Sequence, residues 1–247
     1  MRAVLGIDAA WTQTRPSGLA LVVGDSGGWR LIAVESGTLP GVTTILDSAS
    51  MRCGCAIDLV AVDMPLARSP IVGRRFSDNQ VSTAYGSRKC GTYTPSALRP
   101  GALSDALTGD FRLAGYPLLT ETIAPPGLIE VYPHPALVEL IRASERLPYK
   151  ASKVRTYWPL ATPSERRARL YRQWNEIAAS LESEITGVMA ALPQLDLDAR
   201  AVEMKAYEDM LDAVICAWVG ICALEGQAIP YGNHDAAIWI PKAVVAV

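Results

Sequence analysis

The sequence predicts an α/β fold, because short apolar strands and helices follow one another along the chain. Three observations carry this prediction: an apolar segment that ends at Asp8, a second that ends at Asp63, and a long apolar run over residues 210–224. The first two are short, branched and bounded by breakers, which is typical of interior strands. The third, MLDAVICAWVGICAL, has no apolar/polar alternation and indicates a buried helix.

Five candidate strands cover residues 1–8, 17–24, 29–37, 56–63 and 127–132. The Gly-rich turn at 24–28 favours an antiparallel meander for the first three strands. A helix over 41–51 leads into the fourth strand by a crossover, and further helices are expected from Pro135 and over about 160–190. We therefore expect a mixed five-stranded sheet with helices on both faces.

Residues 66–126 form a polar insertion after the fourth strand. They are rich in Gly, Pro, Ser, Thr and Arg, too polar for a core and long enough to suggest a function. The chain has no internal repeat and no low-complexity linker, so the simplest partition is one domain over 1–247 that carries this insertion.

Composition bounds the class of protein. The chain has 247 residues, of which 50% are hydrophobic, and this is ample for a sizeable core. It has no basic N-terminal region followed by a long apolar segment and no stretch of membrane-spanning length, so we expect a soluble, cytoplasmic protein with no membrane partner. Five cysteines give no disulfide framework, and the lone Cys53-x-Cys55 pair does not suffice for a zinc site.

Asp212 is the only charged residue in the apolar run. Asp209 lies one helical turn before it, so both carboxylates are expected on one face of the helix. A lone buried carboxylate is costly unless it is paired, hydrogen-bonded or bound to a cation. The alternative to a functional site is that Asp209 is solvated and that a backbone N–H or an arginine satisfies Asp212.

Asp8 and Asp63 favour the functional interpretation. Each follows an apolar strand, and the carboxyl ends of strands in open α/β sheets usually hold ligands, although either residue alone could form a turn. Three acids at the ends of apolar elements would need a cation if they met. Mg²⁺ or Mn²⁺ is the hard cation used in phosphate chemistry, and we expect Asp8, Asp63 and Asp212 to bind it.

Charge is unevenly distributed. The net charge is −2, but residues 66–175 carry a balance of +8 and the remainder carries −10. A basic flank beside an acidic site suits a polyanion, and the alternative is a set of solvated helix faces, above all at Glu165–Arg169 and Arg172. The expected phosphate-binding residues are Arg74, Arg75, Arg88 and Lys89 in the insertion, with Lys150 and Lys153 after the fifth strand. Tyr85 and Tyr93 could stack on bases.

Three further residues have both a functional and a structural interpretation. Glu130, in the fifth strand, is an additional candidate ligand or general base, or else an acid on a strand surface. His134 lies between two prolines and could relay protons, or it is a capping or buried structural histidine. His234 is expected in a loop, as a structural residue or as one that closes over the site.

Four segments together resemble a known family: GIDAAW at 6–11, VDMP at 62–65, EVYPHPAL at 130–137 and DMLDAVICAW at 209–218. They resemble the domain-of-unknown-function 429 family, whose members are regarded as nucleases of the ribonuclease-H-like superfamily. The order of three antiparallel strands, a helix, an acid-ending strand and a late acidic helix is that of this fold. The Asp209-x-x-Asp212-Ala motif is similar to the terminal helix of Holliday-junction resolvases.

The resemblance implies a metal-dependent nuclease with a two-metal-ion mechanism. Asp8 would bridge two metal ions, Asp63 would stand where many members have Glu, and Asp209 and Asp212 would complete the catalytic set, with Glu130 as a further member. The implied partner is a nucleic acid, and no oligomeric state is implied. Two other classes remain open: a phosphotransferase that shares the fold, and a non-catalytic binding or adaptor domain.

Overall fold

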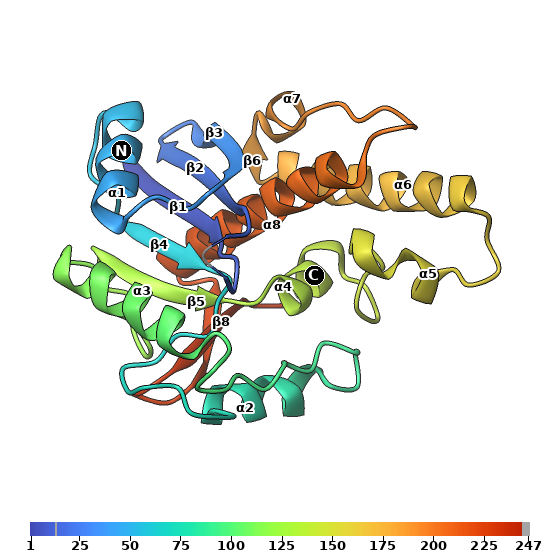
Figure 1. Cartoon of the computed structure of the whole chain (residues 1–247). Coiled ribbons are helices and arrows are strands. Elements are labelled where there is room, and N and C mark those ends of the chain that lie inside the picture. Colours follow the sequence, from blue (N-terminus) through green and yellow to red (C-terminus); the bar gives the residue numbers. More distant parts are fainter. Residues whose placement is uncertain (13, 244–247) are drawn as a thin grey trace.

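The computed structural model describes residues 1–12 and 14–243, and in these residues eight strands form one mixed sheet (Figure 1). The strands are β1 (Arg2–Asp8), β2 (Ser17–Asp25), β3 (Gly28–Gly37), β4 (Leu59–Val62), β5 (Gly127–Val131), β6 (Ile185–Thr186), β7 (Ala228–Gly232) and β8 (Ala237–Pro241). The α/β class and the five expected strands are confirmed, whereas the expected total of five strands is wrong.

The strand order is β6-β3-β2-β1-β4-β5-β8-β7. β1, β2 and β3 form the expected antiparallel meander, and β4 and β5 run parallel to β1. Ile7 of β1 is the register partner of Val62 of β4. The next residues, Asp8 and Asp63, therefore leave neighbouring strands at the same edge of the sheet.

The three strands that we did not expect lie at the two ends of the sheet. β6 has two residues and pairs with β3, so it is too short to produce a periodic pattern. β7 and β8 form an antiparallel hairpin that extends the sheet beyond β5. Pro230 lies within β7 and Pro241 ends β8, and a proline in a short apolar segment argues against a strand unless it lies at an edge.

Helices cover both faces of the sheet, as expected. They are α1 (Val42–Cys53), α2 (Phe76–Tyr85), α3 (Gly101–Leu113), α4 (Pro133–Ile141), the short 3₁₀ helix η1 (Ala151–Lys153), α5 (Val154–Tyr157), α6 (Pro163–Glu182), α7 (Val188–Ala191) and α8 (Ala201–Leu224). α1 and α3 pack on one face, while α4, α6 and α8 pack on the other (Figure 1). The segment between β4 and β5 carries α2 and α3.

Strand periodicity assigns each side chain to one face. In β1, Val4 packs toward α8 while Leu5 and Ile7 pack toward α1; in β4, Ala61 packs toward α8 and Val62 toward α1. Because successive side chains alternate, Asp8 and Asp63 continue the row that faces α8.

α8 approaches the sheet so closely that only glycine fits at the contact. A Cβ atom on Gly18 of β2 would lie 1.9 Å from the carbonyl oxygen of Asp209, and one on Gly6 of β1 would lie 2.1 Å from that of Ala213. The sixteen buried residues of α8 explain why the run over 210–224 is apolar on all sides. In the described part of the chain, no helix is both long enough and apolar enough to cross a bilayer.

We predict that Gly18→Ala destabilises the fold by about 3 kcal/mol or more, because the added methyl group meets backbone atoms of α8 that cannot move without shifting the helix. Gly37→Ala is the matched control, since its Cβ meets no atom within 4 Å, and it should change stability by less than about 1 kcal/mol. Urea denaturation of both variants measures the difference. Equal stabilities would show that α8 can withdraw from β2 at little cost.

Candidate functional site

Four aspartates gather where α8 meets the ends of β1 and β4. Asp8 and Asp63 are partly exposed, whereas Asp209 and Asp212 are buried at 2% and 0% exposure. The charges of Asp212 and Asp63 both raise the pKa of Asp8, and Asp8 in turn acts on the pKa of Asp209. Positions separated by 55 and 149 residues in the chain thus lie in one group.

Asp212 is held by two neighbouring residues that follow α4. The hydroxyl of Tyr149 donates to Asp212 Oδ1 at 2.8 Å, and Lys150 Nζ forms an ion pair with Asp212 Oδ2. Lys150 Nζ also lies 3.6 Å from Glu208 Oε1. The expectation that a buried carboxylate needs a partner holds for Asp212, but the partner is a lysine rather than an arginine.

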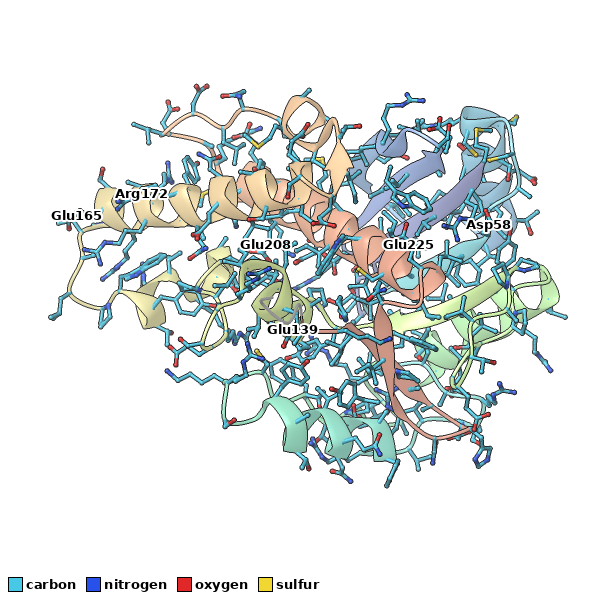
Figure 2. All side chains as sticks on the ribbon, turned by 180° about the vertical axis from the view of Figure 1, so that it is seen from behind. Asp58, Glu139, Glu165, Arg172, Glu208 and Glu225 are labelled. Atoms are coloured by element: carbon cyan, nitrogen blue, oxygen red, sulfur yellow. The ribbon has the colours of Figure 1, made fainter. Side chains whose placement is uncertain are left out.

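A second lysine holds Asp209. Lys205 Nζ forms an ion pair with Asp209 Oδ1 and lies 3.2 Å from Glu208 Oε1. Glu208 lies on α8 (Figure 2). Its Oε2 accepts from the backbone N–H of Ala151 at 2.7 Å, and this bond joins α8 to the segment after α4. Lys205 and Glu208 were not among the residues expected from the sequence. Their spacings could have indicated them, because Lys205 lies four residues before Asp209 and Glu208 lies four residues before Asp212.

Burial and repulsion raise the pKa values of the aspartates. Burial, followed by the charge of Asp212, raises the pKa of Asp8 well above its usual value. Burial raises the pKa of Asp63 to about 7, although Lys150 opposes the shift. Burial also raises the pKa of Asp209 and of Asp212 against the effects of Lys205 and Lys150 respectively. Each charged aspartate is therefore costly in this environment.

We call Asp8, Asp63, Glu208, Asp209 and Asp212 the acidic cluster. With every group ionised, its five negative charges and the two lysines that contact it leave a net charge of −3. Oxygen ligands with excess negative charge suit Mg²⁺ or Mn²⁺. Among the described residues, however, no three acidic, histidine or cysteine side chains are arranged to hold a metal ion as they stand. The lysines account for part of this, because they already engage Asp209 and Asp212.

Glu130 points away from the acidic cluster. Its neighbour Leu128 packs toward α1 and Ile129 toward α8, so alternation directs Glu130 to the face opposite α8. There Glu130 forms a buried ion pair with Arg75, with oxygens 2.5 and 2.7 Å from the guanidinium, and accepts from the Leu66 backbone N–H at 2.7 Å. These contacts give Glu130 a structural role.

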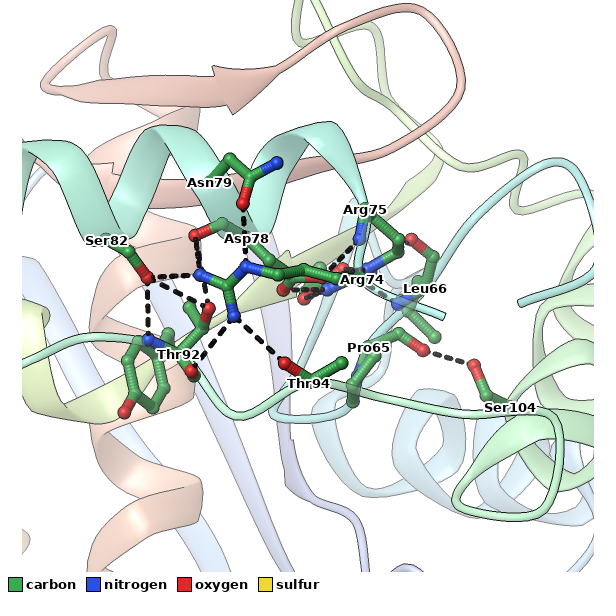
Figure 3. Close-up of polar contacts among 12 residues, drawn as sticks. Pro65, Leu66, Arg74, Arg75, Asp78, Asn79, Ser82, Thr92, Thr94 and Ser104 are labelled. Carbon is green, nitrogen blue, oxygen red and sulfur yellow. Dashed lines mark hydrogen bonds and ion pairs between the residues drawn. The ribbon is translucent and has the colours of Figure 1, made fainter. Parts of the chain in front are cut away.

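The guanidinium groups of Arg74 and Arg75 are bound by groups of the insertion and, for Arg75, also by Glu130 of β5 (Figure 3). All five N–H groups of the Arg75 guanidinium donate, to Asp78, Glu130 and the Leu66 carbonyl. The N–H groups of Arg74 donate to five residues of the insertion: Asp78, Asn79, Ser82, Thr92 and Thr94. Two of the six expected phosphate-binding residues thus have every donor engaged inside the protein.

Two more expected phosphate-binding residues pair with acids after β5. Arg88 Nη1 lies 2.6 Å from Glu139, and Lys89 Nζ lies 2.6 Å from Glu145. The Lys89 pair is exposed on both sides, whereas Glu139 is buried. Both contacts tie the insertion to α4 and the segment after it.

Lys153 and Tyr93 form an exposed pair beside Lys150. Lys153 Nζ donates to Tyr93 Oη at 3.0 Å, and Tyr93 is 61% exposed. Tyr85, by contrast, is buried and packs edge-on against Tyr231. Of the two tyrosines considered for base stacking, Tyr93 alone presents a ring to solvent.

The two histidines lie in different environments. His134 is 5% exposed, and its Nδ1 has no hydrogen-bond partner among the described residues. Burial, followed by the charge of Lys150, lowers the pKa of His134 well below its usual value. His134 is therefore a neutral, buried side chain between Tyr132 and Tyr149. His234 is exposed in the loop between β7 and β8.

The charges over 165–172 lie on α6. Glu165 and Arg172 are exposed on the outer part of this helix, away from the sheet (Figure 2). They form a solvated helix face, which is one of the two interpretations that the sequence allowed. Part of the positive balance of residues 66–175 is thus remote from the acidic cluster.

A family model described as "Protein of unknown function (DUF429)" matches residues 116–236. Residues 116–236, just under half of the chain, belong to this family. The DUF429 match includes β5, α4 and all of α8, and hence Lys150, Asp209 and Asp212. A comparison with curated proteins found no match. The family assignment agrees with the sequence resemblance and carries no activity with it.

We predict that Arg75→Met destabilises the DUF429 chain by about 3–5 kcal/mol, because it leaves the Glu130 and Asp78 carboxylates buried without their partner. Lys89→Met, which removes an exposed ion pair, should cost less than about 1 kcal/mol. Urea denaturation gives both values. A loss below 1 kcal/mol in Arg75→Met would mean that water replaces the guanidinium.

A second prediction concerns pH. Because folding raises the pKa of Asp63 from 3.8 to about 7, the native state binds this proton more tightly than the unfolded state. The stability that Asp63 contributes is present below about pH 4 and is lost as pH rises through 7. Asp63→Asn lacks this titration, so it should gain stability over the wild type as pH rises from about 4 to 7. Urea denaturation without divalent ions tests this, and a difference that is constant with pH contradicts it.

Proposed function

We propose that this protein is a Mg²⁺- or Mn²⁺-dependent nuclease that hydrolyses phosphodiester bonds. The observation that carries the proposal is the gathering of Asp8 and Asp63, at the ends of adjacent parallel strands, against Asp209 and Asp212 of α8. Four aspartates with raised pKa values are unfavourable for folding, and an excess of buried acid is more typical of a ligand site than of a stabilising network.

We also propose that the fold is ribonuclease-H-like. The central strands follow the order β3-β2-β1-β4-β5, with β2 antiparallel to β1 and with β4 and β5 parallel to it. This order, together with a late helix that brings acids against the end of β1, supports the assignment. The hairpin β7-β8, strand β6 and the insertion would be additions to that core.

Asp8 and Asp63 are the residues best placed to hold a divalent cation, because their carboxylates are partly exposed at the strand ends. When bound, such a cation supplies Lewis-acid polarisation of a phosphate and lowers the pKa of water. Asp209 and Asp212 stand behind them, and Tyr149 and Lys150 fix the orientation of Asp212. No side-chain nucleophile is required. The G-x-S-x-G sequence at 24–28 lies in the turn between the strands β2 and β3, whereas a serine nucleophile of this motif lies between a strand and a helix.

Lys153 and Tyr93 are the candidate contacts to the nucleic acid. Both are close to Lys150 along the chain or in space, and they combine a cation with an exposed aromatic ring, as proteins that bind single strands do. Arg74 and Arg75 are not part of this proposal, since all of their donors bond within the protein. The protein would then recognise the sugar-phosphate backbone of the nucleic acid and stack Tyr93 on its bases, rather than read the edges of the bases.

The ion pairs of Lys150 and Lys205 favour a second candidate function, a non-catalytic binding domain. Two lysines neutralise part of the acidic cluster, as expected in a site that has lost its metal ions. In that case the domain would bind its partner without hydrolysis.

The test is cleavage of labelled single-stranded and duplex DNA and RNA and of a four-way DNA junction, with Mg²⁺, Mn²⁺ or EDTA. We expect metal-dependent cleavage that Asp8→Asn and Asp63→Asn each reduce by a factor on the order of 100 or more. Asp198→Asn, at an exposed acid on the loop before α8, is the control and should be as active as the wild type.

Folding of each variant is checked by circular dichroism. Cleavage that persists unchanged in folded Asp8→Asn would assign the activity to a contaminant or another site. A wild type that binds these substrates without cleaving any of them would favour the non-catalytic domain.

A further inference from the structure

Lys150 differs from the other lysine of the site in how firmly it is held. Its side chain is 18% exposed, and that of Lys205 is 52% exposed. Lys205 reaches Asp209 from the preceding turn of the same helix, which is the ordinary i,i+4 arrangement of a helix surface. Lys150 comes from a separate segment and enters the cluster across the interface between that segment and α8.

The backbone on both sides of Lys150 is fixed by buried groups. Trp174 Nε1 of α6 donates to the Tyr149 carbonyl at 2.8 Å, and the Ala151 N–H donates to Glu208 Oε2 at 2.7 Å. Both Trp174 and Glu208 are buried. These two contacts with buried groups therefore fix the Lys150 Cα independently of any contact that its ammonium group makes.

The ammonium group is then placed among three partners. It forms an ion pair with Asp212, lies 3.6 Å from Glu208 Oε1 and lies 4.8 Å from the centre of the Tyr149 ring. Tyr149 also donates its hydroxyl to the other oxygen of Asp212. Both oxygens of Asp212 are thus engaged by protein groups, and a cation already neutralises this carboxylate.

We propose that the Lys150 ammonium group is a permanent cation of this site, which stands at Asp212 in place of a second divalent ion, so that the chain binds one such ion at Asp8 and Asp63. The inference rests on the metal-binding part of the proposed function and replaces its two-ion form. A lysine is suited to this because its ammonium group is a compact point charge. Charge balance agrees: one divalent ion reduces the net charge of the cluster and its lysines from −3 to −1.

The experiment is the stoichiometry of Mn²⁺ binding, measured by isothermal titration calorimetry and by the loss of the free-ion electron paramagnetic resonance signal. Wild type should bind one ion. Lys150→Met, which frees Asp212 and Glu208, should bind two. Lys153→Met is the matched control: it removes a lysine from the same segment that contacts Tyr93 rather than an acid, and it should still bind one ion.

A second variant covers the case in which Lys150→Met fails to fold. Asp212→Asn keeps the shape of the side chain and should still bind one Mn²⁺ ion, with an affinity that falls by no more than about 100-fold, the range for a residue behind the metal ligands. A loss greater than about 100-fold would identify Asp212 as a metal ligand and overturn the inference.

The outcomes separate the inference from the proposed function. Two ions in the wild type, or one ion in both wild type and folded Lys150→Met, overturn the role of Lys150 and leave the nuclease proposal standing. No ion in the wild type ends the metal-dependent proposal. The inference, which places one ion at Asp8 and Asp63 of the wild type, is then overturned as well, whatever Lys150→Met binds.

Discussion

The contact between the backbone of α8 and the backbone of β1 and β2 is the constraint on which the rest of the structure depends. Gly6 and Gly18 allow the helix to approach until strand carbons and helix carbonyls are within van der Waals distance. The position and rotation of α8 about its axis are fixed by that contact. Asp209 and Asp212 consequently face the strand ends, and the apolar remainder of the helix is buried on every side. The packing of α8 on the sheet thus brings the carboxylates together although their negative charges repel one another.

Alternation along the strands explains which acids take part. Asp8 and Asp63 continue the rows that face α8, whereas Glu130, on the adjacent strand β5, belongs to the opposite row. All three could be recognised from the sequence as acids in or after apolar strands. The face of each could not, because a strand that is buried on both sides has no polar row to mark its orientation. The order of the central strands and the gathering of Asp8, Asp63 and Asp212 follow from local sequence patterns and from the topology of the sheet. The partner of Glu130 is Arg75, which lies in the insertion, and no periodic pattern in the sequence specifies how the insertion folds back onto β5.

The same limit applies to the basic residues. Counting charges over 66–175 indicates a positive flank, but charge alone does not distinguish an arginine that binds a ligand from one that holds a loop. Arg75 anchors the insertion to β5 through Glu130, and Arg88 anchors it to α4 through Glu139. Guanidinium groups suit such positions because five N–H groups in one plane can satisfy several acceptors at once. The residues that built the case for a phosphate-binding surface are in large part the residues that keep the insertion in place.

The lysines at the acidic cluster act on the proposed site itself, whereas the arginines hold the insertion in place. An ammonium group that neutralises Asp212 stabilises the fold in the absence of a metal ion, and it also lowers the attraction of the site for a divalent cation. A chain that relied on two ions would gain little from burying Lys150 between Tyr149, Glu208 and Asp212 and fixing its backbone from two sides. A chain that binds one ion would gain a site that is oriented before the ion binds, because Tyr149 and Lys150 hold the carboxylate of Asp212 in the absence of any metal ion. On this reasoning the ion pair would preorganise the proposed metal site, and the partly exposed Asp8 and Asp63 would be the pair on which the proposed cation binding depends.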